Sequence, residues 1–134
     1  LLFALIMKKK ENKRISEMLD NLEKSKLLNY AKEDFINSDR IIGTGMAIQS
    51  DIKLGDKFLF SIYPAYIIPY SWIDNIKVDE ICGRGGRRIY LDFTLKESDE
   101  SIEIFFAKED VAEKIKDFSL KTKAKNNREK IFKN

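Results

Sequence analysis

Two stretches near the start of the chain repeat apolar residues at the spacing of an amphipathic helix. The repeat predicts one helix over residues 12–24 and a second over residues 26–37. The polar residue Ser25 separates them, and a polar run over residues 37–39 follows the second. The apolar stripes consist of Ile15, Met18, Leu19 and Leu22 in the first helix and of Leu27, Leu28, Ala31 and Phe35 in the second. Both stripes need burial, so we expect the two helices to pack on whatever sheet follows.

From Arg40 onward the apolar period becomes alternating, which predicts strands. Pro64 and Pro69 confine their segment to an edge or a corner of the sheet. The clearest strand places Ile89, Leu91, Phe93 and Leu95 on one face and Arg88, Tyr90, Asp92 and Thr94 on the other. The other candidates are residues 42–48, 58–63, 66–68, 72–78 and 102–106, with a turn at 51–56. Because about six short strands follow one another without a helix between them, we expect an antiparallel, strongly curved sheet.

A third helical stripe follows the strands and predicts a C-terminal helix over residues 108–121. Its apolar face consists of Val111, Ala112, Ile115 and Phe118, and Glu109 and Asp110 lie in its first turn, where the helix dipole favours them. The fold class predicted from these periods is α+β: a curved antiparallel sheet with N-terminal helices and a C-terminal capping helix.

The first seven residues form an unbroken apolar run that meets three lysines, Lys8 to Lys10. Seven residues cannot cross a bilayer, which needs about 20, but they match the end of a truncated transmembrane helix. Basic residues directly after such a helix are typical of the cytoplasmic side. The alternative is an N-terminal strand or an adhesive chain end. The predicted segments are a transmembrane remnant (1–7), a helical segment (8–39), a β domain with its C-terminal helix (40–121) and a polar tail (122–134).

The composition limits the chemistry more than it limits the fold. The 134 residues fit one domain, and a net charge of +3 is low for a nucleic-acid-binding domain. The absence of histidine removes Ser-His-Asp catalysis and His-ligated zinc. The single cysteine, Cys82, forms no internal disulfide, and we expect it to be a small apolar filler at a strand end. The sequence predicts no metal, no cofactor and no nucleic-acid partner.

The segment from Gly83 to Arg88 has the residue types of an anion-binding loop. Closely spaced glycines let backbone N–H groups turn toward one anion, and Arg84, Arg87 and Arg88 supply bidentate phosphate donors. These arginines are the candidate headgroup-binding residues. The alternative is a hairpin tip whose arginines are ordinary solvated side chains.

Aromatic residues gather around the two prolines and form a second candidate site. Tyr66, Tyr70 and Trp72 are of the types that dominate protein interfaces, which makes them candidate partner-binding residues. The alternative is core packing. Carboxylates are plentiful, but no spacing fixes two of them around a shared site, and a solvated face accounts for them. They include Asp79, Glu80, Asp99, Glu100, Glu103, Glu109 and Asp110.

The run Leu54-Gly55-Asp56-Lys57-Phe58-Leu59-Phe60 enters its strand through a glycine, two polar residues and an aromatic residue. This run and two others resemble the pleckstrin-homology-like superfold, especially its bacterial membrane-associated members and the related GRAM domains. The run from Ile67 to Ile76 is similar to their isoleucine-proline-tyrosine corner, and the hairpin from Ile89 to Phe106 is similar to their last strand pair before a helix. The phrase Leu22-Glu23-Lys24-Ser25 also resembles a bacterial family of unknown function with membrane helices ahead of such a domain.

The resemblance covers residues 15–120 and implies a partial barrel closed by one helix, but no ligand, because fold does not fix function. Together with the apolar run, it leads us to expect a non-catalytic binding or scaffolding module, membrane-associated, on the cytoplasmic side of a membrane protein. Its partner would be a protein or an anionic lipid headgroup. The alternative is a self-associating structural module whose strand edge or N-terminal helices drive homo-oligomerisation.

Overall fold

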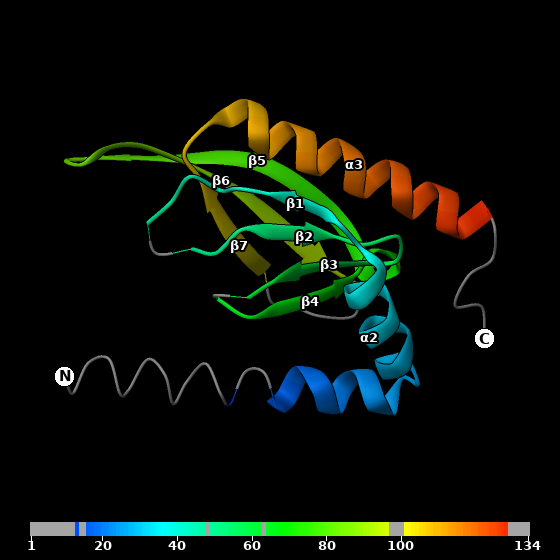
Figure 1. Cartoon of the computed structure of the whole chain (residues 1–134). Coiled ribbons are helices and arrows are strands. Elements are labelled where there is room, and N and C mark those ends of the chain that lie inside the picture. The colour runs from blue at the N-terminus through cyan, green and yellow to red at the C-terminus, as the bar shows by residue number, and fades with distance from the viewer. Residues whose placement is uncertain (1–12, 14–15, 48, 63, 97–100, 129–134) are drawn as a thin grey trace.

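The chain is an α+β structure with two antiparallel sheets and helices at both ends (Figure 1). The computed structural model describes residues 13, 16–47, 49–62, 64–96 and 101–128. Residues 16–24 are helical. The elements that follow are α2 (Leu28–Asn37), β1 (Arg40–Ile42), β2 (Ile52–Leu54), β3 (Phe58–Ser61), β4 (Tyr66–Pro69), a 3₁₀ turn η1 (Tyr70–Trp72), β5 (Ile73–Gly83), β6 (Gly86–Leu95), β7 (Ser101–Phe106) and α3 (Glu109–Arg128).

The strands divide into a four-stranded sheet in the order β1-β2-β3-β4 and a three-stranded sheet in the order β5-β6-β7. All neighbouring strands pair antiparallel, as predicted, but the two sheets do not join into a closed barrel. The single curved sheet expected from the sequence is therefore two sheets. β4 is the last strand of its sheet, which fits the edge position predicted from its proline, Pro69.

The predicted strand over residues 42–48 is wrong, because β1 ends at Ile42. Beyond it the Thr44 hydroxyl accepts from the Met46 N–H at 3.3 Å and donates to the Gln49 carbonyl at 3.4 Å, which closes a local turn. Gly45 sits in that turn at φ 75°, a backbone conformation that favours glycine. β1 pairs with β2, which lies within residues 51–56, the segment predicted to be a turn.

The larger of two hydrophobic cores lies between the inner faces of the two sheets and α3. Its centre contains Leu59 of β3, Leu91 and Phe93 of β6, and Ala112 and Ile115 of α3, all inaccessible to solvent. The stripe of the predicted C-terminal helix is therefore buried as expected. The helix is longer than predicted, since it ends at Arg128 and not at residue 121, so residues 122–128 of the predicted polar tail are helical.

A smaller core joins the N-terminal helices to the outer face of the first sheet. Leu22, Leu27 and Ala31 pack against Phe58 and Phe60 of β3. The expectation that the helical stripes pack on the sheet is confirmed for these residues. Helix 16–24 lies along the side of the β1–β4 sheet away from α3 in Figure 1. The β1–β4 sheet is thus covered on both faces, and the helical segment shares a core with the strands that follow it.

The run predicted to be a transmembrane remnant, residues 1–7, lies outside the described residues. Among the helices that the structure describes, none is long and apolar enough to span a bilayer.

A side chain closes the free edge of β7. The Gln49 amide donates to the Phe105 carbonyl at 2.8 Å and accepts from the Phe105 N–H at 2.9 Å, as a neighbouring strand would. Next to it, the Ala107 N–H donates to the Thr44 carbonyl at 2.9 Å. The loop between β1 and β2 therefore ties the two sheets together at this corner.

Replacing Gln49 by Ala should lower the free energy of unfolding by about 2 kcal/mol, because two partly buried backbone groups lose their partners. Gln49→Glu should cost at least as much, since it places a carboxylate oxygen against the Phe105 carbonyl. Urea unfolding followed by circular dichroism measures both. A Glu variant as stable as the wild type would show that this corner is held by other contacts.

Candidate functional site

The β5–β6 hairpin that carries the three candidate arginines extends beyond the body of the domain (Figure 1). Its strands are the longest of the described part, and residues 80–88 are all exposed. The turn lies between Gly83 and Gly86, as the sequence predicts, and Gly86 has φ 96°. Cys82 is exposed at the end of β5, so it lies at a strand end as expected but fills no core.

The three arginines do not converge on one point. Arg87 and Arg88 are consecutive in β6, so their side chains leave opposite faces of the hairpin. Arg87 forms ion pairs with Glu80 on β5 and, at 3.3 Å, with Glu109 at the start of α3. Hydrogen bonding to Glu80, more than any other contact, raises the pKa of the Arg87 guanidinium. Arg87 thus ties the hairpin to α3. The other two candidate arginines, Arg84 and Arg88, form no ion pair with the described residues.

The aromatic residues near the prolines do not form one surface. Tyr70 is completely buried in the larger core, and its hydroxyl donates to the Gly55 carbonyl at 3.0 Å. Burial raises the pKa of that hydroxyl, so it remains a donor. Tyr66 is half-buried against the larger core and Trp72 against the smaller one. Core packing, the alternative reading of this cluster, accounts for the position of Tyr70.

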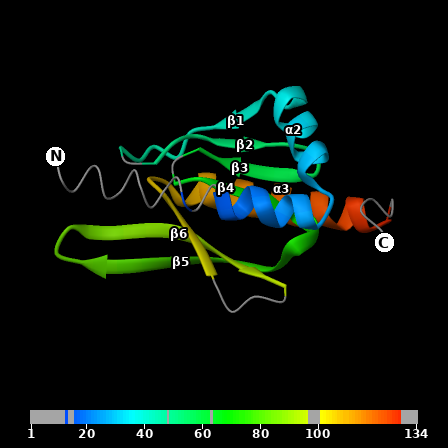
Figure 2. The ribbon, with the colours of Figure 1, turned by 90° about the horizontal axis from the view of Figure 1, so that it is seen from below.

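The outer face of the β5–β6–β7 sheet is the sheet surface that the described helices leave open. In Figure 2 no helix lies on the side of the β5–β6 hairpin that points away from the β1–β4 sheet. The register places its side chains in four rows, from the base of the hairpin to its tip. The rows are Asn75, Thr94 and Ser101; then Lys77, Asp92 and Glu103; then Asp79, Tyr90 and Phe105; then Ile81 and Arg88.

Aromatic side chains occupy the middle of this outer face. The rings of Tyr90 and Phe105 lie 5.2 Å apart, and both side chains are half-buried. Partial loss of hydration, followed by the nearby charges of Asp79, Glu103 and Asp92, raises the pKa of the Tyr90 hydroxyl. Near the tip Ile81 is 47% exposed and stands opposite Arg88. The face therefore presents an apolar centre between charged ends.

The charges on this face are only partly compensated. Lys77 binds Asp79 at 3.3 Å, and the hydrogen bonds that Asp79 accepts, first from the Glu80 N–H, lower the pKa of its carboxyl group. Asp92 stands beside Glu103, and one of its carboxylate oxygens is buried without a hydrogen-bond partner among the described residues. Carboxylates placed side by side on neighbouring strands repel each other. Lys77 stands opposite Asp92 in the same row, but its ion pair is with Asp79, so carboxylates outnumber cations at this end of the face.

The other carboxylates named from the sequence are Glu80, Asp99, Glu100, Glu109 and Asp110. Asp99 and Glu100 lie outside the described residues, while Glu109 binds Arg87. Within the described part of the chain no group of three or more metal-ligating side chains is arranged to hold an ion.

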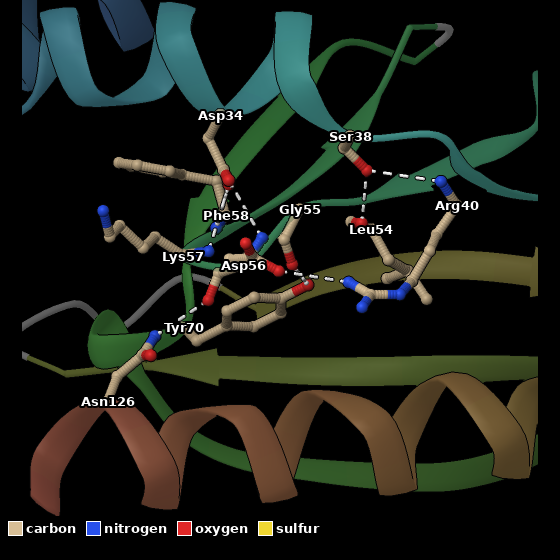
Figure 3. Close-up of polar contacts among 10 residues, drawn as sticks. All are labelled: Asp34, Ser38, Arg40, Leu54, Gly55, Asp56, Lys57, Phe58, Tyr70 and Asn126. Atoms are coloured by element: carbon tan, nitrogen blue, oxygen red, sulfur yellow. Dashed lines mark hydrogen bonds and ion pairs between the residues drawn. The ribbon is translucent and has the colours of Figure 1, made fainter. Parts of the chain in front are cut away.

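The sequence reasoning missed a buried polar cluster around the β2–β3 turn (Figure 3). The Asp34 carboxylate on α2 accepts three backbone N–H bonds, from Asp56 at 2.9 Å, Lys57 at 3.0 Å and Phe58 at 2.9 Å. Gly55 lies directly against this carboxylate. Asp34 is 9% exposed and closes the turn as a helix cap closes a helix.

Three other side chains hold the carbonyl side of the same turn. Ser38 donates to the Leu54 carbonyl at 2.6 Å, and Asn126 of α3 donates to the Asp56 carbonyl at 3.2 Å. Tyr70 of η1 donates to Gly55 as described above. Because every one of these groups is used for a backbone contact, the cluster is a structural joint and not a reactive site. The sequence contains one sign of this cluster: Asp34 lies on the same helix face as the apolar residues Leu27 and Ala31.

Comparison of the chain with known family models, with curated proteins and with solved structures found no match.

Proposed function

We propose that this chain is a non-catalytic binding module that holds a protein partner against the outer face of its β5–β6–β7 sheet. The observation that carries the proposal is the open face itself. There the Tyr90–Phe105 pair lies between an arginine and two carboxylates that form no ion pair with any residue the structure describes. Partly exposed aromatic and arginine side chains are the groups that contribute most to protein interfaces.

A protein partner fits this face better than a lipid headgroup does. A phosphate needs converging cations, whereas Arg87 is occupied and points away from Arg88. The carboxylates of Asp92 and Glu103 repel an approaching anion. Side chains of both signs around an apolar centre are typical of a contact with another polypeptide.

The proposal has two further parts: the domain is related to the pleckstrin-homology-like superfold, and it is tethered to a membrane. The order of the elements supports this relationship, because four antiparallel strands are followed by three more and then by one C-terminal helix. The apolar run at residues 1–7 and the lysines after it support a tether with the domain on the cytoplasmic side. On this proposal the module works as a scaffold beside the membrane, without a cofactor.

Photo-crosslinking of the full chain in bacterial membranes tests the proposal. A benzophenone amino acid at position 105 should give a discrete protein adduct, and Asp92→Lys in the same chain should remove it. The matched control is the same probe at Tyr30, an aromatic residue of α2 that is 49% exposed on a different surface. Adducts with lipid alone at position 105 would contradict the proposal and favour headgroup contact. The absence of any adduct at this position would also contradict the proposal.

A further inference from the structure

We infer that the partner of the outer β5–β6–β7 face is a second copy of this chain, bound face to face about a two-fold axis. The inference rests on the proposed function, since it names the occupant of the same surface. The order of the side chains along β6 points to a second copy. When the same strand runs in the opposite direction across the interface, positive side chains face negative ones.

Along β6 the outward positions are Arg88, Tyr90 and Asp92, so that a cation, an aromatic ring and an anion follow one another. Arg88 and Asp92 are about 13 Å apart, at about 3.3 Å per strand residue. A two-fold axis that passes over Tyr90, parallel to the sheet and perpendicular to its strands, reverses this order in the second copy. Each Arg88 then stands opposite the second copy's Asp92, and the two Tyr90 rings meet at the centre.

The neighbouring strands fit the same arrangement. Glu103 of β7 lies beside Asp92 in the register, so each Arg88 meets two carboxylates that form no ion pair within the described residues. The pairing brings the Arg88 guanidinium of one copy beside the Asp92 carboxylate of the other. The row of Ile81 falls opposite the row of Lys77, whose aliphatic stem can cover the exposed isoleucine. Two sheets packed in this way lie about 10 Å apart, the spacing of a β-sandwich.

One side chain opposes the arrangement, and its charge is already compensated. Asp79 shares the middle row with Tyr90 and so approaches its own counterpart across the axis. Its ion pair with Lys77 neutralises it within each copy. An interface of this kind is closed, because both copies use the same patch, and it therefore gives dimers and not filaments.

A charge-swap experiment on the full chain tests the inference by sedimentation velocity, from micromolar to near-millimolar concentration. The wild type should show a monomer–dimer equilibrium. Arg88→Asp alone and Asp92→Arg alone should each weaken it by about tenfold or more, because each places like charges opposite one another twice. An equimolar mixture of the two variants should form a heterodimer, since each residue at position 88 then faces a residue of opposite charge at position 92. The matched control is Arg87→Ala, which removes a neighbouring arginine from the other face and should leave the dimer unchanged.

The outcomes separate this inference from the proposed function. A wild type that stays monomeric throughout, or a dimer indifferent to both single swaps, overturns the second-copy inference. If the probe at position 105 then still gives a discrete protein adduct lost in Asp92→Lys, the proposed function stands with a different partner. If it gives none, both fail. Misfolding cannot imitate the expected result, because two misfolded variants would not dimerise on mixing.

Discussion

Replacing Asp34 by Ala should lower the free energy of unfolding by about 4 kcal/mol, a large part of the 5–15 kcal/mol typical of a domain. The carboxylate accepts the N–H groups of Asp56, Lys57 and Phe58, and hydrogen bonds to a charged acceptor are stronger than neutral ones. Without it these donors lose their partner in a partly buried turn. Urea unfolding followed by circular dichroism gives the difference directly.

Two further variants make this prediction specific to the carboxylate. Asp34→Asn keeps one acceptor oxygen and should lose roughly half as much stability as Ala. Glu33→Ala removes an exposed carboxylate from the same helix and should change the unfolding free energy by less than about 0.5 kcal/mol. If Asp34→Ala fell within the range of this control, the joint would contribute little to the fold.

The second large effect is expected for Gly55→Ala, which should cost about 3 kcal/mol. A Cβ at position 55 would lie 2.9 Å from Oδ1 of Asp34 and closer still to Oδ2, so the carboxylate has to leave the turn or the turn has to move. Either response breaks the hydrogen bonds that Asp34 accepts. The backbone of Gly55 is not left-handed, so the cost comes from this close approach.

A double-mutant cycle separates that cause from a general loss of stability. In the Asp34→Ala background the added Cβ no longer meets a carboxylate, so the two changes together should cost about 2 kcal/mol less than their sum. Gly83→Ala is the matched glycine control, because nothing lies within 4 Å of its added Cβ. Strict additivity of Asp34→Ala and Gly55→Ala would show that the two residues do not act through one contact.

The two faces of β6 could be predicted because residues 88–95 alternate strictly. The sequence pattern placed Leu91 and Phe93 on one face and Arg88, Tyr90 and Asp92 on the other, and the structure confirms both sets. Local turn chemistry also located the Gly83–Gly86 tip. What the pattern could not give was the fate of Arg87, because its carboxylate partner Glu109 is distant in sequence.

The short elements were missed for a different reason. β2 has only three residues, and a strand of that length contains too few alternations to stand out from a turn. The end of α3 was placed too early because its apolar stripe thins out before Asn126, which is nevertheless buried by its bond to the Asp56 carbonyl. Asp34 was overlooked because a charged residue in a helix is normally assigned to the solvent face. In each case a tertiary contact decided the local structure.

The packing of Leu22 and Ala31 against Phe58 and Phe60 has a mechanical consequence. The helical segment shares a core with β3, and its Asp34 binds the β2–β3 turn, so these contacts oppose rotation of the segment relative to the sheets. A force applied to helix 16–24 therefore acts on the strands through the same contacts. Whatever this helix is fastened to, its direction in space sets the direction in which Tyr90 and its neighbours point.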